Sequence, residues 1–191
     1  MKVKYNEEEA KHLFFTSDTH FDHKNIIRFC NRPWETVEEM NQALIDNWNS
    51  VVGPDDTVFH LGDVTFGGNT KLIEHVSKLN GHIILIKGNH DKKLQQTICD
   101  KLFDYSCQQL RLNIEGYTVI LNHYPFLCFA EDIQLFGHIH SPSESNDVYK
   151  FSCCGDHSSQ YDVGVDNNDY KPVSWQQIKS HYAITESTFK N

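Results

Sequence analysis

Five short runs of apolar, β-prone residues are spaced along the chain, and each run predicts a strand. Each run is followed at once by a few polar residues rich in Asp, Asn, His and Gly. The runs are Leu13–Phe15, Val58–Leu61, Ile83–Ile86, Val119–Leu121 and Ile133–Phe136. Because a rigid sheet can deliver the side chains that follow its strands to a shared cleft, the pattern predicts one site at the strand ends.

Apolar residues at helical spacing predict three helices. The first begins after Thr36, which forms a capping-box pattern with Glu39, and it ends before a Gly-Pro pair. The second covers about residues 69–80, and the third covers about residues 174–182.

The second half of the chain changes from strand–helix alternation to a succession of strands. Residues 103–122 alternate apolar and polar positions around a turn at 113–116, which predicts an antiparallel hairpin. Segments near 147–153 and 161–165 predict further short strands. We therefore predict an α/β fold of two packed sheets with helices on the outer faces.

No repeat, linker or low-complexity tract divides the chain, so we predict a single domain over residues 1–191. Residues 1–11 are charged and aperiodic, which predicts a loose N-terminal tail or a short edge strand. No apolar stretch approaches the length of a membrane span, and the N-terminus lacks the apolar core of a signal peptide. Six scattered cysteines without a Cys-x-x-Cys pair complete the prediction of a reduced, cytoplasmic protein.

The net charge of the chain limits the classes of partner that it can bind. A formal net charge of −9 argues against strong non-specific binding to nucleic acid, which requires a basic face. A small phosphorylated substrate such as a nucleotide is compatible with this charge, because bound metal cations reverse the field inside a site. We predict no membrane partner, and the sequence leaves the oligomeric state open.

The polar clusters carry the donors of a divalent transition-metal site, namely imidazole, carboxylate and one carboxamide. One such cluster alone is as often a turn as a ligand site, but five in order at strand ends are not expected by coincidence. Two ions that share a ligand need roughly seven or eight donors. The predicted donors are Asp18, His20, Asp63, Asn89, His123, His138 and His140. The histidines at positions 60, 75, 82, 157 and 181 are assigned to packing or to the surface.

Read in chain order, these clusters resemble the signature of the calcineurin-like metallophosphoesterase superfamily. The matching blocks are Asp18-x-His20, Gly62-Asp63, Gly88-Asn89-His90-Asp91, His123 and Gly137-His138-x-His140. The match covers residues 18–140 without a substitution in any block, and the flanking residues look like those of small bacterial and phage members. The resemblance implies a four-layer α/β/β/α sandwich of two mixed sheets.

The resemblance also implies which ion each donor binds. It places three residues on a first metal ion, Asp18, His20 and His140. It places three on a second ion, Asn89, His123 and His138, with Asp63 bridging both. The implied cofactors are two divalent transition-metal ions, with Mn²⁺ expected from the family and Fe, Zn, Ni or Co compatible with mixed nitrogen and oxygen ligands.

The implied chemistry is hydrolysis of a phosphoester, in which a metal-bound hydroxide attacks phosphorus. In this interpretation His90 assists the leaving group and Asp91 orients the His90 imidazole. A small chain with little length for a cap over the site favours phosphodiesters, including cyclic or short nucleotides. A phosphomonoesterase or a nucleotide pyrophosphatase is the alternative, and a non-catalytic metal-binding scaffold is a third hypothesis.

Several further residues are candidates for the rim of the site. Asp22 and His23 follow the first cluster and could contact a substrate, or lie in a solvated loop. Arg28 and Arg32 are candidates for bidentate contacts with phosphate, or are ordinary exposed arginines. The segment Cys153–His157 has no zinc-site spacing and is predicted to be an exposed loop.

Overall fold

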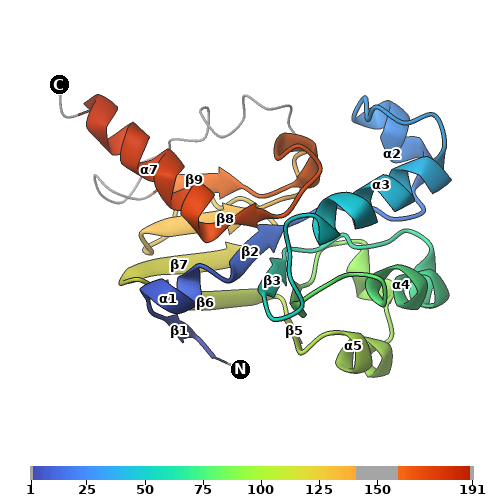
Figure 1. Ribbon diagram of the computed structural model, residues 1–191, viewed down its shortest axis with the longest axis horizontal. Helices are drawn as coiled ribbons and strands as arrows, with labels where there is room; N and C mark the ends of the chain where they lie inside the picture. The colour runs from blue at the N-terminus through green and yellow to red at the C-terminus, as the bar shows by residue number, and fades with distance from the viewer. Residues whose placement is uncertain (1, 141–158, 190–191) are drawn as a thin grey trace.

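Within the residues that the structure describes, 2–140 and 159–189, two five-stranded sheets pack face to face (Figure 1). The coordinates are a computed structural model. The first sheet consists, in spatial order, of β1 (Lys4–Tyr5), β6 (Gln109–Ile114), β7 (Tyr117–Asn122), β8 (Ile133–Phe136) and β9 (Ser159–Asp162). The second sheet consists of β10 (Val173–Ser174), β2 (Leu13–Thr16), β3 (Thr57–His60), β4 (His82–Ile86) and β5 (Tyr105–Cys107).

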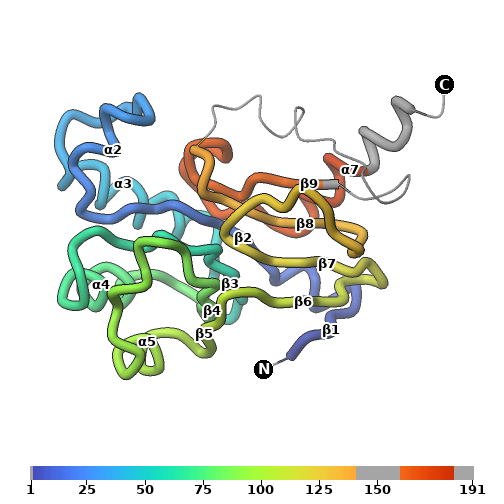
Figure 2. Tube along the Cα trace, turned by 180° about the vertical axis from the view of Figure 1, so that it is seen from behind, coloured from blue at the N-terminus to red at the C-terminus, as the bar shows by residue number. Residues whose placement is uncertain are grey.

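Both sheets combine parallel and antiparallel neighbours. In the first sheet β6 and β7 are antiparallel whereas β7 and β8 are parallel, and Figure 2 shows these strands side by side. In the second sheet β10 is antiparallel to β2, and the strands from β2 to β5 are parallel. The predicted α/β fold of two mixed sheets is confirmed, and all five predicted strands are present.

Helices lie on both sides of the pair of sheets (Figure 1). The helices on one side are α2 (Lys24–Phe29), α3 (Val37–Asn49), α4 (Gly68–Val76) and α5 (Gln96–Leu102). The other two, toward the opposite side, are α1 (Glu7–Ala10) and α7 (Trp175–Phe189). Two short 3₁₀ turns, Asp91–Lys93 and Val165–Asn167, follow β4 and β9.

Helix α3 forms where the sequence predicts it. The Thr36 hydroxyl accepts the backbone N–H of Glu39 at 3.2 Å, and the Glu39 carboxylate accepts the backbone N–H of Thr36 at 3.2 Å. This reciprocal capping box satisfies two backbone donors that would otherwise be unpaired at the helix start. Its apolar face, with Met40, Leu44 and Trp48, is buried against the second sheet and its neighbouring helices.

The two faces of the second sheet belong to two different cores. Its inner face packs against the first sheet, and there the rings of Phe15 and Phe59 stack with centroids 5.3 Å apart. Its outer face, with Val58 and Leu85, packs against helices α2–α5. Because the central strands are buried on both faces, they are almost continuously apolar and end in polar residues only where they leave the core.

Three further predictions have different outcomes in the structure. The hairpin is β6–β7 with its turn at 115–116, but β5 pairs with β4 in the other sheet, because residue 108 separates two strands that diverge. Residues 1–11 hold an edge strand, β1, and helix α1, so the edge-strand alternative holds rather than the loose tail. The strand expected near 161–165 is β9, and the one expected near 147–153 lies outside the described residues.

Two expectations about the environment of the chain can be compared with the structure. In the described part of the chain no helix has the length and apolar character required to cross a bilayer. Cys30, Cys99 and Cys107 are free thiols, whereas Cys128 is disulfide-bonded, so the expectation of a wholly reduced chain does not hold at that residue.

Candidate metal centre

The five polar clusters follow β2, β3, β4, β7 and β8, and the structure brings them together. Beyond the strand ends, the backbones of the first two clusters remain hydrogen-bonded. The N–H of Asp18 donates to Gly62 O at 2.9 Å, and the N–H of His20 donates to Asp63 O at 3.0 Å. These bonds fix the first two clusters relative to each other before any ligand is bound.

Five of the seven predicted donors have left-handed backbone conformations. Their φ angles are 59° at Asp18, 50° at His20, 56° at Asp63, 73° at His138 and 47° at His140. Non-glycine residues rarely adopt such angles, and those that do cluster at functional sites. The Asp18/His20 and His138/His140 pairs are therefore presented by left-handed turns beyond the strands and not by extended segments.

Two glycines allow the clusters to approach one another. A Cβ at Gly88 would lie 2.2 Å from Asp63 Oδ1, and a Cβ at Gly137 would lie 2.2 Å from Ser17 Oγ and 2.3 Å from Asp18 Oδ2. Any side chain at these positions would therefore displace a predicted donor. This close approach requires a residue without a Cβ at both positions.

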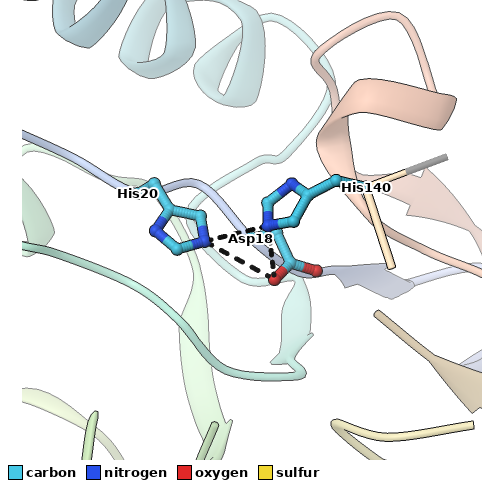
Figure 3. Close-up of side chains that lie close together, drawn as sticks. All are labelled: Asp18, His20 and His140. Atoms are coloured by element: carbon cyan, nitrogen blue, oxygen red, sulfur yellow. Dashed lines mark hydrogen bonds and ion pairs between the residues drawn. The ribbon is translucent and has the colours of Figure 1, made fainter. Parts of the chain in front are cut away.

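One group of donors consists of Asp18, His20 and His140 (Figure 3). Asp18 Oδ1 lies 3.8 Å from His20 Nε2 and 3.7 Å from His140 Nε2, and the two nitrogens are 3.2 Å apart. A triangle with these sides has a circumradius of about 2.1 Å, which is the length of a metal–nitrogen or metal–oxygen bond. Asp18 Oδ1 is also buried without a hydrogen-bond partner among the described residues, as expected of an atom reserved for a cation.

A second group forms around His123. Its Nε2 atom lies 3.0 Å from Asn89 Oδ1 and 3.5 Å from Asp63 Oδ2, and its ring centroid is 5.0 Å from that of His138. His123 Nδ1 donates to Leu61 O at 2.7 Å, which leaves Nε2 as the lone-pair nitrogen on the side of the other donors. Asp63, His123 and His138 offer ligand atoms within 4.8 Å of one another.

Asp63 connects the two groups. Its Oδ2 atom lies 3.6 Å from His20 Nε2 and 3.5 Å from His123 Nε2, while its Oδ1 accepts the backbone N–H of His90 at 2.9 Å. Burial favours the neutral acid, but the contacts with His123 and with the His90 N–H outweigh it and lower the pKa of Asp63 below its usual value. The residue is therefore a buried carboxylate shared by two clusters of nitrogen and oxygen donors.

The residues present fit two divalent transition-metal ions. The seven predicted donors are all found in these two groups, with Asp63 common to both. Mixed imidazole, carboxylate and amide donors suit Mn, Fe, Co, Ni or Zn better than Mg or Ca.

The two predicted catalytic residues are placed differently. His90 Nε2 lies 3.8 Å from Asp63 Oδ2 with its side chain 38% exposed, so its imidazole faces both the donors and solvent. Asp91 is fully buried, and its carboxylate accepts the backbone N–H groups of Asp63, Val64 and Gly88 at 2.7–3.1 Å. The prediction that Asp91 orients the His90 imidazole is therefore wrong, because these amides occupy its oxygens. Asp91 instead clamps the two loops that carry Asp63 and Asn89.

Sequence reasoning missed Asp166, which supports the first group. Its Oδ2 atom accepts His140 Nδ1–H at 2.8 Å, so His140 presents Nε2 to Asp18. Although burial opposes protonation, the hydrogen bonds to Asp166 and Cys30 and the nearby Asp18 charge raise the pKa of His140 to about 10. The position of Asp166, just after a short predicted strand, was the only signal in the sequence.

Arg32 proves to be an internal residue. Its guanidinium donates to both oxygens of Asp166 at 2.7 and 2.9 Å and to the carbonyls of Asp18 and Thr19. The side chain is fully buried, so the candidate role in binding substrate phosphate does not apply to Arg32. It joins the loop that carries Asp18 and His20 to the residue that orients His140.

The remaining candidate residues either pack within the protein or lie at the rim of the site. Asp22 accepts His75 Nε2–H at 2.7 Å and Asn41 Nδ2–H at 3.0 Å, and its side chain is 17% exposed, so both of its oxygens have partners within the protein. His23 lies at the rim with its ring 5.3 Å from that of His20, and burial together with the charges of His20 and His90 lowers the pKa of His23 to about 4. His60 packs behind the loops, as predicted, and the segment Cys153–His157 lies outside the described residues.

Comparison with known proteins agrees with this geometry. Residues 11–189 match the family described as calcineurin-like phosphoesterase. The chain belongs to the calcineurin-like phosphoesterase family. Its members are metal-dependent phosphoesterases and typically bind a dinuclear metal centre, so the resemblance seen in the sequence is confirmed.

Relatives from an archaeon and a phage are similar to this phosphoesterase-family chain. The uncharacterized protein MJ1445 of Methanocaldococcus jannaschii is 36% identical over 171 residues, which cover 87% of this chain and 88% of the relative. The Gene 66 protein of Mycobacterium phage L5 is 32% identical, with coverage of 68% and 77%. Among solved structures, the protein of unknown function AQ665 from Aquifex aeolicus superposes with a TM-score of 0.70 at 27% identity, covering 88% of this chain and 97% of that one.

Proposed function

We propose that this protein is a phosphoester hydrolase that works with two divalent transition-metal ions. The observation that carries the proposal is the position of Asp63, whose carboxylate lies between two donor groups that each suit one ion. Asp18, His20 and His140 would hold the first ion with Asp63, and Asn89, His123 and His138 would hold the second. When bound, such a pair of ions supplies charge that stabilises phosphoryl oxygens and lowers the pKa of a water molecule.

In this proposal His90 acts on the leaving group. Hydrolysis forms a bond from phosphorus to the water oxygen and breaks the bond to the leaving alcohol, whose oxygen then needs a proton. His90 Nε2 lies beside Asp63 and is partly exposed, so it can reach a substrate bound over the two donor groups. The Asp91 clamp holds the backbone of the His90 loop in place while this proton moves.

A phosphodiester is the preferred substrate in this proposal, and a phosphomonoester or a nucleotide pyrophosphate is the alternative. The side chains around the donors, including His90 and Tyr124, are partly exposed, which leaves room for substituents on both sides of a phosphoryl group. The net charge of −9 favours a small phosphorylated substrate over duplex nucleic acid. Mn²⁺ is the metal that we expect to support activity best.

The test is hydrolysis of bis-p-nitrophenyl phosphate against p-nitrophenyl phosphate. Metal-stripped protein is refilled separately with Mn²⁺, Ni²⁺, Zn²⁺ and Mg²⁺, and bound metal is counted in each sample. We expect metal-dependent turnover, faster on the diester than on the monoester. Absence of turnover on both substrates, in protein shown to hold two ions, would overturn the proposal in favour of the scaffold alternative.

The role of His90 has its own test. His90→Ala should leave the metal content unchanged and lower kcat by about 10²–10⁴-fold on a dinucleoside monophosphate, whose alkoxide leaving group needs a proton. The loss should be much smaller on bis-p-nitrophenyl phosphate, because p-nitrophenolate leaves without one. The exposed His82 provides the matched control, since His82→Ala should change neither rate. Release of metal from His90→Ala would show that His90 is a ligand instead.

A further inference from the structure

Exposed aromatic side chains border the candidate centre next to His90. Phe66 lies in the loop after β3, three residues beyond Asp63, and is 53% exposed. Its ring centroid is 5.1 Å from that of His90. A phenylalanine this exposed gives up much of the stabilisation that burial would provide, so its position beside the reacting groups calls for an explanation.

The Phe66 ring is held in a defined orientation. The His23 ring stacks on one of its faces, with centroids 4.1 Å apart and an interplanar angle of 11°. Its backbone is also fixed, because the Phe66 N–H donates to Phe21 O at 2.8 Å and the Thr65 hydroxyl donates to the same carbonyl at 3.1 Å. With one face covered by His23 and about half of the residue exposed, the opposite face is left open to solvent.

Phe66 therefore presents a fixed, flat, apolar surface that is partly open to solvent, at the side of the centre where His90 lies. Surfaces of this kind bind aromatic rings by stacking, and they accept any nucleobase because every base has a π-face.

We propose that Phe66, supported by His23, is a stacking platform for the nucleobase of the leaving nucleoside. This inference rests on the proposed function, in which His90 protonates the leaving oxygen. In a nucleotide one sugar ring separates the phosphoester oxygen from the base. In this site His90 Nε2 lies 3.8 Å from Asp63 Oδ2, and the His90 ring centroid lies 5.1 Å from that of Phe66, so the leaving oxygen and its base would meet neighbouring residues. The substrate class is thus a phosphodiester whose leaving group is a nucleoside.

The experiment compares two matched substrates of the Mn²⁺-loaded protein. One is a thymidine dinucleoside monophosphate, and the other lacks only the base of the nucleoside that product analysis identifies as the leaving group. We expect the wild type to prefer the complete dinucleotide by about tenfold or more in kcat/KM, since stacking on one aromatic ring supplies a factor of this size. Phe66→Ala should abolish that preference and leave hydrolysis of the abasic analogue unchanged, and Phe66→Tyr should restore the preference.

Phe29 provides the control. It is also an exposed phenylalanine, at 62%, but its ring meets that of His23 edge-on at 6.4 Å instead of stacking on it, and Phe29→Ala should change neither rate. Equal losses on both substrates in Phe66→Ala would mean that Phe66 only supports His90. No loss on either substrate would mean that Phe66 contacts neither the substrate nor a residue that hydrolysis requires. Either result would overturn the platform.

Failure of the platform can be separated from failure of the proposed function. Wild-type turnover of bis-p-nitrophenyl phosphate in the same preparation reports the function alone. If no phosphoester is hydrolysed, Phe66→Trp still reports the platform through its fluorescence. Thymidine 5′-monophosphate should then quench the added indole, whereas deoxyribose 5-phosphate should not. Identical responses to the two compounds would refute base stacking at this position.

Discussion

The two donor groups of the candidate centre are held to different degrees. In the first group Asp18 and His20 are 1% and 2% exposed, and an internal pair, Arg32 and Asp166, orients His140. In the second group His123 is buried and fixed by Leu61 O, but the His138 side chain is partly exposed and lies against Tyr124, with ring centroids 4.6 Å apart. Tyr124 is itself 40% exposed.

This difference predicts that the two donor groups hold their ions with different strength. A donor set whose orientation is fixed by buried partners loses little entropy when it binds a cation, so its cation should be tightly held. Both groups contain one partly exposed imidazole, but His140 is oriented by Asp166 whereas His138 lies against the exposed Tyr124, so the second set should release its cation or admit substrate more easily. We therefore expect the first ion to be the structural anchor of the centre and the second to exchange with solution.

Asp63→Asn should have the greatest effect, because this carboxylate is the element that both groups share. We expect loss of both ions and a fall in kcat/KM of about 10³-fold or more, as both ions are needed to stabilise the transition state. Metal counting by mass spectrometry, together with turnover of bis-p-nitrophenyl phosphate, gives the measurement. Asp55→Asn, an exposed residue before β3, makes the same charge change and should be silent. Retention of one full ion by Asp63→Asn would show that the groups bind independently.

Exchange kinetics test the difference between the groups directly. When protein loaded with two Mn²⁺ ions meets excess chelator, we expect one ion per chain to leave quickly and the other slowly. His138→Ala should remove the fast phase, and His20→Ala should remove the slow phase. A single phase for both ions in the wild type would show that burial of the first group gives no kinetic advantage.

Asp166→Asn should lower the affinity for the first ion only. An asparagine is neutral and has one acceptor oxygen instead of two, so it cannot keep both the hydrogen bond from His140 and the ion pair with Arg32, and the first group loses its orientation. Partners of this kind typically contribute 10–100-fold to metal affinity, and we expect a loss of that size at the first ion, with the second unchanged. Titration calorimetry of metal-stripped protein measures the affinity for each of the two ions. Asp169→Asn, an exposed aspartate three residues away, is the matched control. Equal weakening of both ions would contradict the selective support of the first group.

Substitution of His60 should have the smallest effect at neutral pH. This residue packs behind the loops that carry Thr19 and Gly62. Its Nε2–H donates to Thr19 Oγ1, and its Nδ1 accepts the N–H of Gly62, so the neutral ring is required. Burial lowers the pKa of His60 to about 4 in the folded protein. Since the unfolded chain binds this proton near pH 6.5, full stability is present above that pH and is lost as the pH falls toward 4, by about 3 kcal/mol from this residue.

Urea denaturation of the metal-free protein between pH 7 and 4 checks this expectation. His60→Asn, which can still accept from Gly62 without taking up a proton, should flatten the pH dependence while changing activity at pH 7.5 by less than about threefold. An unchanged pH dependence in His60→Asn would assign the acid sensitivity to other groups.

The sequence by itself determined the five strands that precede the polar clusters, the helix capped by Thr36 and the seven candidate donors that the structure brings together. These features depend on local rules, namely apolar runs, capping chemistry and donor type, and a residue carries them wherever its segment lies. The assignment of the strands to the two sheets was harder to predict from the sequence, and β5 was assigned to the wrong sheet. Two strands separated by one residue look the same whether they continue or diverge, and only packing between the sheets decides which occurs.

The tertiary structure alone decided how the donors are supported and what surrounds them. Asp91 was expected to hold an imidazole and instead binds three backbone amides, because the loop after β4 brings its carboxylate under the neighbouring loop. Asp166 and Phe66 have no distinctive neighbours in the sequence, yet the first orients His140 and the second stands beside His90. Contacts between residues far apart in the chain depend on how whole layers pack, and no local pattern records that arrangement.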